Sequence, residues 1–539
     1  MSRPSLWRVL LAGPALVPPV FATQLAGNPR VRLFVFLPDQ EVRDGAEERL
    51  AAIPPAGEGA SPGPPPITLL EEGGEEEVDI LLVDLGQLDQ DDESFRKMFD
   101  SAKAVGLLAR SPAARITLEE FREVPAERCF GLRTVQGERG YGLEIVRLPG
   151  STAETLDLAS RWAQDVAPFH VTLEYDARGG MLERVRVPLE TEAWRLVRES
   201  GIPPALVEHL SRAVFGSEWG VFARVLREGP SRRGEVARLM AAVNPGDSRF
   251  RVVADAFPPD RPGSLWRDLA KGPGSAAAAG GEEAPKAVLI AGSPHLAEAW
   301  SETLYESSGG RVRAHTLAMW DSEGFEDADL KAVGRHGPYD LVLECLLSPV
   351  EDRLRLIDFL QPYFAEGGQL WAHTLNAAST IAVQVVPQDL CAVGFGGLPP
   401  LWDIPAVELM KPSSSDTADL ARAAAAAGHL GLHPFEVADE PGGVSARLLA
   451  TLINATAYVV REGIVASPAE ADQAVKDALG LPASPFALAD RVGLDVMEAV
   501  IVGLEVFLGE DRYRVCPDIT MRIEAGAVGQ VTGSGYYLP

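Results

Sequence analysis

Short apolar runs alternate with amphipathic stretches through much of the second half of the chain. The strand-like runs lie at 287–290, 341–343, 369–373 and 392–394. Helical patterns separate several of them, for example at 297–307 and 352–364. This alternation predicts a doubly wound, mainly parallel sheet of the Rossmann type.

The pattern becomes helical from Gly443 onward. Residues 448–460 form one apolar helical stretch, and residues 487–508 form another. An α/β domain followed by an all-α domain is therefore expected in this half of the chain.

The same features recur in the first half at a nearly constant spacing. Three dipeptides have a counterpart 263 residues further on: Phe169-His170 with Leu432-His433, Gly179-Gly180 with Gly442-Gly443, and Arg198-Glu199 with Arg461-Glu462. A constant spacing across several features indicates two tandem copies, the first strongly diverged. The predicted domains are Rossmann-like at 1–178, helical at 179–270, a Gly/Ala-rich linker at 271–285, Rossmann-like at 286–440 and helical at 441–539.

The N-terminus has two interpretations. Residues 9–22 are largely apolar and follow Arg3 and Arg8, which is the outline of a signal peptide. The other interpretation is a buried first strand at 8–11, and it is favoured because a similar apolar run ending in Gly and Pro recurs at 288–294. Apart from this segment, no run of 18 apolar residues occurs, so a membrane span is not expected.

The composition of the chain narrows the classes of partner and site that are expected. The 539 residues include 49 Lys and Arg against 77 Asp and Glu, a formal charge of −28. Such a chain would repel phosphate backbones, so nucleic acid is an unlikely partner. The four cysteines are widely spaced and form no CxxC motif, so neither a metal site nor a disulfide framework is predicted and a cytoplasmic location is expected. High Ala, Gly, Arg and Pro content suggests a GC-rich bacterial genome.

Four segments of the second half resemble, in order, the L-3-hydroxyacyl-CoA dehydrogenase family. They are REGIVASP (461–468), LPASPFALAD (481–490), VGLD (492–495) and EAGAVGQVTGSGYY (524–537). The resemblance implies an NAD-dependent oxidoreductase of fatty-acid metabolism. Its α/β domain would bind the dinucleotide, its helical domain would dimerise, and a His–Glu pair would act on the substrate hydroxyl.

The glycine-rich turn of that family is only partly present. The motif G-x-G-x-x-G permits a tight turn and close approach to a pyrophosphate. Here Gly292 remains, Pro294 lacks an N–H, and His295 or Leu296 is assigned to the third glycine. Gly292, Ser293 and Glu344 are the cofactor candidates. No acid for the ribose occurs at 313–317, and Asp39 is a late candidate in the first half.

The family's catalytic pair is incomplete. Its His falls on Gly396 and its Glu on Glu408; in the first half Arg133 takes the His position, with Glu144 as the expected orienting acid. Arginine stays protonated and cannot act as a base. The family's supporting Ser and Asn fall on Asn376 and Ala446, and His373 is a substitute base by its position three residues before Asn376.

Two main hypotheses follow. The first is a catalytically impaired family member, a pseudoenzyme that acts as a binding or structural/regulatory subunit. It would hold an acyl-CoA or another protein, and its halves would form an intrachain pseudo-dimer. The alternative is an active NAD-dependent oxidoreductase on 3-hydroxyacyl-CoA or a related hydroxy acid, using Glu408, Asn376 and His373. A weaker third hypothesis is a hydratase-like or lyase-like activity of Glu408 alone.

Overall fold

The computed structural model describes most of the chain, in two compact units. The described residues are 6–12, 24–25, 27–36, 67–70, 77–84, 93–109, 116, 125–252, 256–257, 267, 269, 271–274, 276, 283–320, 327–387, 390–398 and 405–537. The first unit comprises Met1–Val185, Ala242–Asn244 and Glu462–Gly480. The second comprises Arg186–Ala241, Pro245–Arg461 and Leu481–Pro539. The five domain bounds derived from the sequence stay a prediction.

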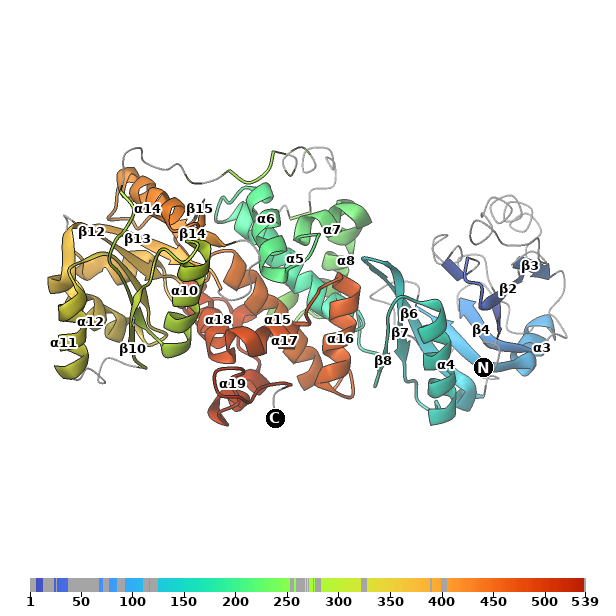
Figure 1. The fold of residues 1–539 in the computed structure, drawn as a ribbon. Coiled ribbons are helices and arrows are strands. Elements are labelled where there is room, and N and C mark those ends of the chain that lie inside the picture. The colour runs from blue at the N-terminus through green and yellow to red at the C-terminus, as the bar shows by residue number, and fades with distance from the viewer. Residues whose placement is uncertain are drawn as a thin grey trace. The chain divides into compact units, whose positions relative to one another are not determined.

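The first unit is built on a mixed sheet (Figure 1). Its described strands are, in spatial order, β3 (Ile67–Leu70), β2 (Val31–Phe36), β1 (Trp7–Ala12), β4 (Val78–Asp84), β5 (Ala102–Leu108), β6 (Cys129–Gly137), β7 (Gly140–Val146) and β8 (His170–Leu173). The strand predicted at 8–11 is β1, which pairs in parallel with β2 and β4. Near-continuous apolar sequence is typical of such a strand, because a parallel sheet is covered on both faces.

The second unit contains the second sheet. Its described strands are, in spatial order, β10 (His315–Ala318), β9 (Val288–Gly292), β11 (Tyr339–Cys345), β12 (Phe364–His373), β13 (Cys391–Gly396), β14 (Ala406–Met410) and β15 (His433–Val437). The four strands predicted from apolar runs correspond to β9, β11, β12 and β13. The doubly wound architecture expected from the sequence is confirmed.

The two sheets have the same topology. Apart from β3, each strand of the first sheet has a counterpart in the same spatial position of the second. In both, the hairpin pair is antiparallel, β6 with β7 and β13 with β14, and the other described pairs are parallel. The repeat inferred from spacing therefore has a structural counterpart.

Helices flank the sheets in both units. Those next to the strands are α3 (Glu93–Ser101), α4 (Ala153–Val166), α10 (Pro294–Ser307), α11 (Asp327–His336), α12 (Val350–Leu360), α13 (Ser379–Ala382) and α14 (Thr417–His429). A core packs between α4 and the first sheet, centred on Trp162 and Phe130. An equivalent core of the second unit contains the buried side chains of Tyr339, Leu356 and Leu370.

The helical segments also correspond between the halves. Four helices of the first half, α5 (Leu182–Arg198), α6 (Pro204–Phe215), α7 (Val221–Glu228) and α8 (Pro230–Val243), have counterparts that begin 263 or 264 residues later. The counterparts are α15 (Ser445–Arg461), α16 (Pro468–Leu479), α17 (Pro485–Val492) and α18 (Leu494–Leu508); α19 (Pro517–Glu524) follows them. Even the end of the second helix is repeated, because Gly216 and Gly480 terminate α6 and α16 with φ of 61° and 60°.

One helix prediction was wrong in its extent. The single helix expected at 487–508 is two helices, α17 and α18, which are separated by Gly493. That glycine has φ of 108°, a backbone conformation that other residues rarely adopt. The apolar pattern continues across the glycine, so hydrophobicity alone did not reveal the break.

Candidate functional site

In the second half, Gly396 and Glu408 are direct neighbours on adjacent strands. They pair in the antiparallel β13–β14 ladder. A Cβ atom at position 396 would lie 3.0 Å from Cε of Met410 and 3.4 Å from Oγ1 of Thr374. The space beside Glu408 therefore contains a methionine methyl group and a threonine hydroxyl, and the residue at the His position has no side chain.

The carboxylate of Glu408 binds the start of helix α15. Its Oε2 accepts a hydrogen bond from Val444 N at 2.6 Å, and its Oε1 accepts one from Ser445 N at 2.9 Å. The N–H groups of a first helical turn have no partner inside the helix, and the helix dipole favours negative charge there. Burial raises the pKa of Glu408, and these hydrogen bonds oppose the rise. Both carboxylate oxygens thus serve to begin the helix.

The first half repeats this arrangement. Arg133 pairs with Glu144 in the β6–β7 ladder, the register of Gly396 and Glu408. Glu144 Oε1 accepts hydrogen bonds from the N–H groups of Met181 at 2.9 Å and Leu182 at 2.8 Å, at the start of α5. Burial raises the pKa of Glu144 to about 7. Arg133 forms an ion pair with Asp176 at 2.6 Å. The orienting acid lies where the sequence placed it, and its neighbour is a permanent cation.

Glycine is needed where each helix meets its carboxylate. A Cβ at Gly443, which has φ of 53°, would lie 2.3 Å from Oε2 of Glu408. A Cβ at Gly180, which has φ of 66°, would lie 1.8 Å from Oε2 of Glu144. Close approach of a carboxylate to the backbone therefore explains the second glycine of each repeated Gly-Gly pair.

Three of the predicted site residues lie around Arg353, a residue that was not predicted from the sequence. The guanidinium donates to Glu344 Oε2 at 2.7 Å and to Asn376 Oδ1 at 3.0 Å. It also donates to the carbonyl oxygen of His373 at 2.5 Å. The side chains of Glu344 and Arg353 are completely buried. A signal was present, because Arg353 lies on the apolar stripe of α12 with Leu356, Ile357 and Leu360.

His373 is a fixed, neutral imidazole. Its Nδ1 accepts a hydrogen bond from Leu375 N at 3.1 Å, so its Nε2 carries the proton and donates to Leu346 O at 2.8 Å. Burial lowers the pKa of His373 to about 4, and the charge of Arg353 adds to the effect. Asn376 is also engaged at both ends, because its Nδ2 donates to Ser348 O at 3.0 Å. The structure thus brings His373, Asn376 and Glu344 together, while Glu408 binds elsewhere.

The turn between β9 and α10 retains part of a dinucleotide motif. A Cβ at Gly292 would lie 2.3 Å from the carbonyl carbon of Cys345, so glycine is required at the strand end. Counting from Gly292, the third glycine position of the motif is Ala297, which is buried. The assignment of that position to His295 or Leu296 was wrong. The helix-packing position therefore remains small. The second position is Pro294, the first residue of α10, which has no N–H to donate.

Ser293, another cofactor candidate in this turn, is hydrogen-bonded inside the protein. Its Oγ accepts a hydrogen bond from Leu347 N at 2.9 Å. His295, at the start of α10, has a side chain 10% exposed, with Nε2 3.4 Å from Oδ2 of Asp495. Burial lowers the pKa of His295, and Asp495 opposes the effect. Asp39 lies outside the described residues.

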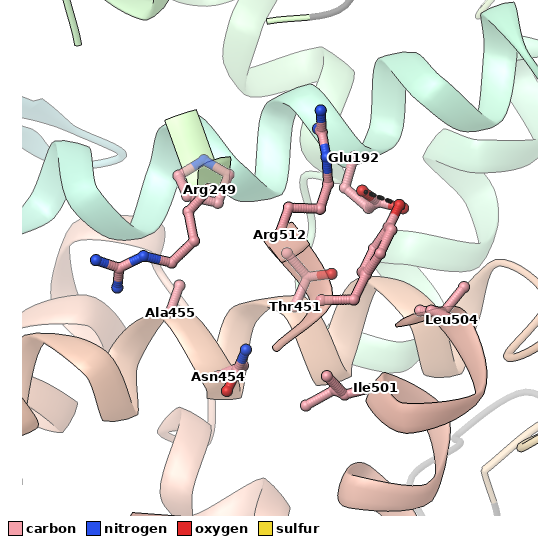
Figure 2. Close-up of a pocket in the computed structure, with 10 residues that line it drawn as sticks. Glu192, Arg249, Thr451, Asn454, Ala455, Ile501, Leu504 and Arg512 are labelled. Atoms are coloured by element: carbon pink, nitrogen blue, oxygen red, sulfur yellow. Dashed lines mark hydrogen bonds between the residues drawn. The ribbon is translucent and has the colours of Figure 1, made fainter. Parts of the chain in front are cut away.

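A cavity lies elsewhere in the second unit, among helices of both halves (Figure 2). It is lined by Pro188, Glu192, Arg249, Thr451, Asn454, Ala455, Ile501, Leu504, Arg512 and Tyr513. Glu192 accepts hydrogen bonds from the Tyr513 hydroxyl at 2.9 Å and from Arg447 Nε. None of the predicted site residues lines this cavity.

Two further findings concern the part of the chain that the structure describes. No helix there is both long and apolar enough to cross a membrane. No group of three or more His, Cys, Asp and Glu side chains there could hold a metal ion.

Comparison with known proteins gives a consistent result. The model of the 3-hydroxyacyl-CoA dehydrogenase C-terminal domain matches residues 442–538. A protein named "Probable 3-hydroxybutyryl-CoA dehydrogenase" from Bacillus subtilis is 32% identical over 173 residues, which are 31% of this chain and 59% of that protein. One of the same name from Deinococcus radiodurans is 30% identical over 200 residues, 37% of this chain and 71% of that protein.

The fold of nearly the whole chain has a counterpart among solved structures. The structure of 3-hydroxybutyryl-CoA dehydrogenase from Escherichia coli K12 is similar with a TM-score of 0.62 at 14% identity. The match covers 97% of this chain and 99% of that one, so the similarity includes both sheets. This structural match shows the fold. The Deinococcus radiodurans relative, 30% identical and matched over 71% of its length, shows that the chain belongs to the 3-hydroxyacyl-CoA dehydrogenase family.

Proposed function

We propose that this protein is a non-catalytic 3-hydroxyacyl-CoA dehydrogenase-like chain that acts as a binding or structural/regulatory subunit. The observation that carries the proposal is that, among the residues that the structure describes, no base lies beside Glu408. A general base must lie within hydrogen-bond reach of the proton it removes. Gly396 has no side chain, and Arg133 at the same position of the first half is a cation bound to Asp176.

The groups that could replace the imidazole are engaged in internal hydrogen bonds. Glu408 binds two backbone N–H groups, and His373 uses both ring nitrogens. Asn376 bonds to Arg353 and to Ser348 O. The alternative function is an active oxidoreductase that uses these three residues. These buried hydrogen bonds would then have to break before Glu408, His373 or Asn376 could contact a substrate. This requirement supports the non-catalytic proposal.

We also propose that the second half binds NAD weakly or not at all. When bound, NAD would accept hydride from the substrate carbon. The β9–α10 turn has one glycine of the motif and a small third residue, but Pro294 removes a backbone donor for the pyrophosphate. The carboxylate of Asp495 beside His295 adds negative charge near the same helix end, and this charge disfavours a phosphate.

The two halves are proposed to be duplicated copies that pair within the chain. The matching sheet order, the helices spaced by 263 or 264 residues and the repeated Glu–helix contact support this view. The proposed small ligand is an acyl-CoA, the class of compound in the relatives' names. A second protein is the alternative binding partner.

The experiment is calorimetric titration with NAD⁺, NADH and acetoacetyl-CoA beside a turnover assay. The wild-type protein is expected to give no turnover and no dinucleotide binding. The double variant Gly396→His with Met410→Ala restores an imidazole opposite Glu408 and makes room for it, and Met410→Ala alone is the control. The double variant is expected to stay inactive because the cofactor turn is unchanged. Turnover by the wild-type protein would overturn the non-catalytic proposal, and micromolar NADH binding would overturn the cofactor proposal.

A further inference from the structure

The cavity of Figure 2 lies where equivalent surfaces of the two halves meet inside the second unit. Six of its lining residues form three pairs spaced by 263 residues, the spacing that relates α5 to α15: Pro188 with Thr451, Glu192 with Ala455, and Arg249 with Arg512. Residues that are equivalent in two copies come together in this way around a two-fold axis. The helical segments of the two halves therefore meet here as the two subunits of a symmetric dimer would.

Each half contributes the same short motif to this interface, an acid followed two residues later by an arginine. In the first half Asp247 accepts a hydrogen bond from Arg249 Nη2 at 2.5 Å, and in the second half Glu510 accepts one from Arg512 Nε at 2.8 Å. Each acid is also the residue before a 3₁₀ turn. The two motifs are 263 residues apart, so they are equivalent by sequence as well as by their contacts.

The side chains that these motifs face differ between the halves. Arg249 lies over the ring of Tyr458 on α15, with its Cζ 4.1 Å from the ring centre. Glu510 accepts two hydrogen bonds from Arg195 on α5, at 2.5 Å and 2.8 Å. Arg195 and Tyr458 are equivalent positions of the two helices, again 263 residues apart. One side of the interface is thus an aromatic contact and the other is an ion pair.

The difference between the halves is larger at the buried centre of the interface. Glu192 accepts hydrogen bonds from Arg447 Nε and, at 2.9 Å, from the Tyr513 hydroxyl. The side chains of Glu192 and Arg447 are only 2% and 1% exposed. The counterpart of Glu192 in the second half is Ala455, and the counterpart of Tyr513 in the first half is Phe250. The acid and the hydroxyl of this cluster are therefore each present at one of two equivalent positions.

We infer that the helical surface of the second half binds the first half in preference to a second copy of itself. In a pair of two second halves, Ala455 would take the place of Glu192 on both sides. Arg447 would then lose its buried acid and keep Glu440 of its own half, and the Tyr513 hydroxyl would lose its acceptor. Loss of one partner from a buried ion pair strongly disfavours the mismatched assembly, and this difference is specificity. The inference rests on the proposed pairing of the halves within one chain.

The test moves the acid from the first half to the second in the full-length chain. The double variant Glu192→Ala with Ala455→Glu gives two second halves a reciprocal ion pair with Arg447, and within one chain it leaves Arg447 without an acid from α5. Light scattering after size-exclusion chromatography is expected to show twice the wild-type mass, and the melting temperature is expected to rise with protein concentration. The wild-type protein is expected to melt at one temperature over about a hundredfold range of concentration.

Two further variants separate the place of the acid from general destabilisation. Glu192→Ala alone removes the acid without supplying it elsewhere, so it is expected to lower the melting temperature and to leave the mass unchanged. Arg447→Met removes the charge that a pair of second halves would leave buried, so it is expected to raise the mass as the double variant does. This variant keeps the test decisive if the double variant does not fold.

The possible results distinguish the inference from the proposal on which it rests. The inference is wrong if the double variant or Arg447→Met folds and keeps the wild-type mass. It is also wrong if Glu192→Ala associates as much as they do. A wild-type melting temperature that rises with concentration would instead overturn the proposed pairing within one chain.

Discussion

Gly396 and Glu408 face each other across the β13–β14 ladder, yet the carboxylate of Glu408 turns to the first N–H groups of α15. Arg133 and Glu144 have the same register in the first half, and Glu144 begins α5 in the same way. Both acids thus accept hydrogen bonds from the backbone at the start of a helix. A glutamate in this motif is therefore poor evidence of catalysis unless the histidine accompanies it.

Removing the Glu408 carboxylate should destabilise the second unit. Glu408→Ala leaves two buried N–H groups without acceptors, at about 1–3 kcal/mol each, so a loss of about 2–6 kcal/mol is expected. Glu408→Gln should lose about half as much. Denaturant unfolding followed by circular dichroism measures the effect, and Glu436→Ala, which removes an exposed acid of β15, is the control. Equal losses in Glu408→Ala and Glu436→Ala would contradict the assigned role.

The pH dependence of the first unit should reflect Glu144. Burial raises the pKa of Glu144 from its ordinary 4.5 to about 7, so the folded protein binds this proton more tightly than the unfolded chain. Its contribution to stability is complete below pH 4.5 and is lost as the pH rises through 7. At roughly 1.4 kcal/mol per pKa unit, the loss is about 3 kcal/mol.

Glu144→Gln imitates the protonated acid and should remove this dependence. The melting temperature of the wild-type protein is expected to fall relative to the variant between pH 4.5 and pH 7, and to fall no further above about pH 8. A difference that stays constant from pH 4 to pH 8 would show that Glu144 ionises normally.

His373 should have the opposite effect on stability in the second unit. Burial and the Arg353 charge lower the pKa of His373 from 6.5 to about 4. The stability that its neutral form provides is complete above pH 6.5 and is lost as the pH falls towards 4. His373→Gln keeps one hydrogen-bond donor and one acceptor. The stability of this variant should depend less on pH between pH 4 and pH 6.5. Nuclear magnetic resonance of the imidazole checks the assignment directly, and a titration midpoint near 6.5 would refute it.

The Glu344–Arg353 pair should tolerate joint replacement better than the loss of one partner. Arg353→Met alone leaves a buried carboxylate unpaired, which costs about 3–5 kcal/mol. The double variant Glu344→Gln with Arg353→Met removes both charges and should recover much of that loss. Thermal unfolding of the two single variants and the double variant measures their coupling energy. Additive losses would mean that the two side chains do not act as a pair.

The sequence predicted the sheets and the site register for a physical reason. Buried parallel strands leave continuous apolar runs, and a motif aligned without gaps preserves the pairing of Gly396 with Glu408. The acceptor role of Glu408 was not predictable, because its donors are backbone N–H groups 36 and 37 residues away and leave no side-chain signature. Arg353 was predictable from its place on an apolar helix stripe. The packing of α16 against β6 and β8 depends on contacts between distant segments that no local pattern records.

The packing of α16 in the first unit has a consequence for inheritance. A recombination event that removed the second half of the gene would delete α16 and leave β6 and β8 without the helix that packs against them. Removal of the first half would leave α16 without those strands. Selection therefore acts on the tandem pair as one heritable object, and a change in the second half must preserve a helix that belongs to the first unit.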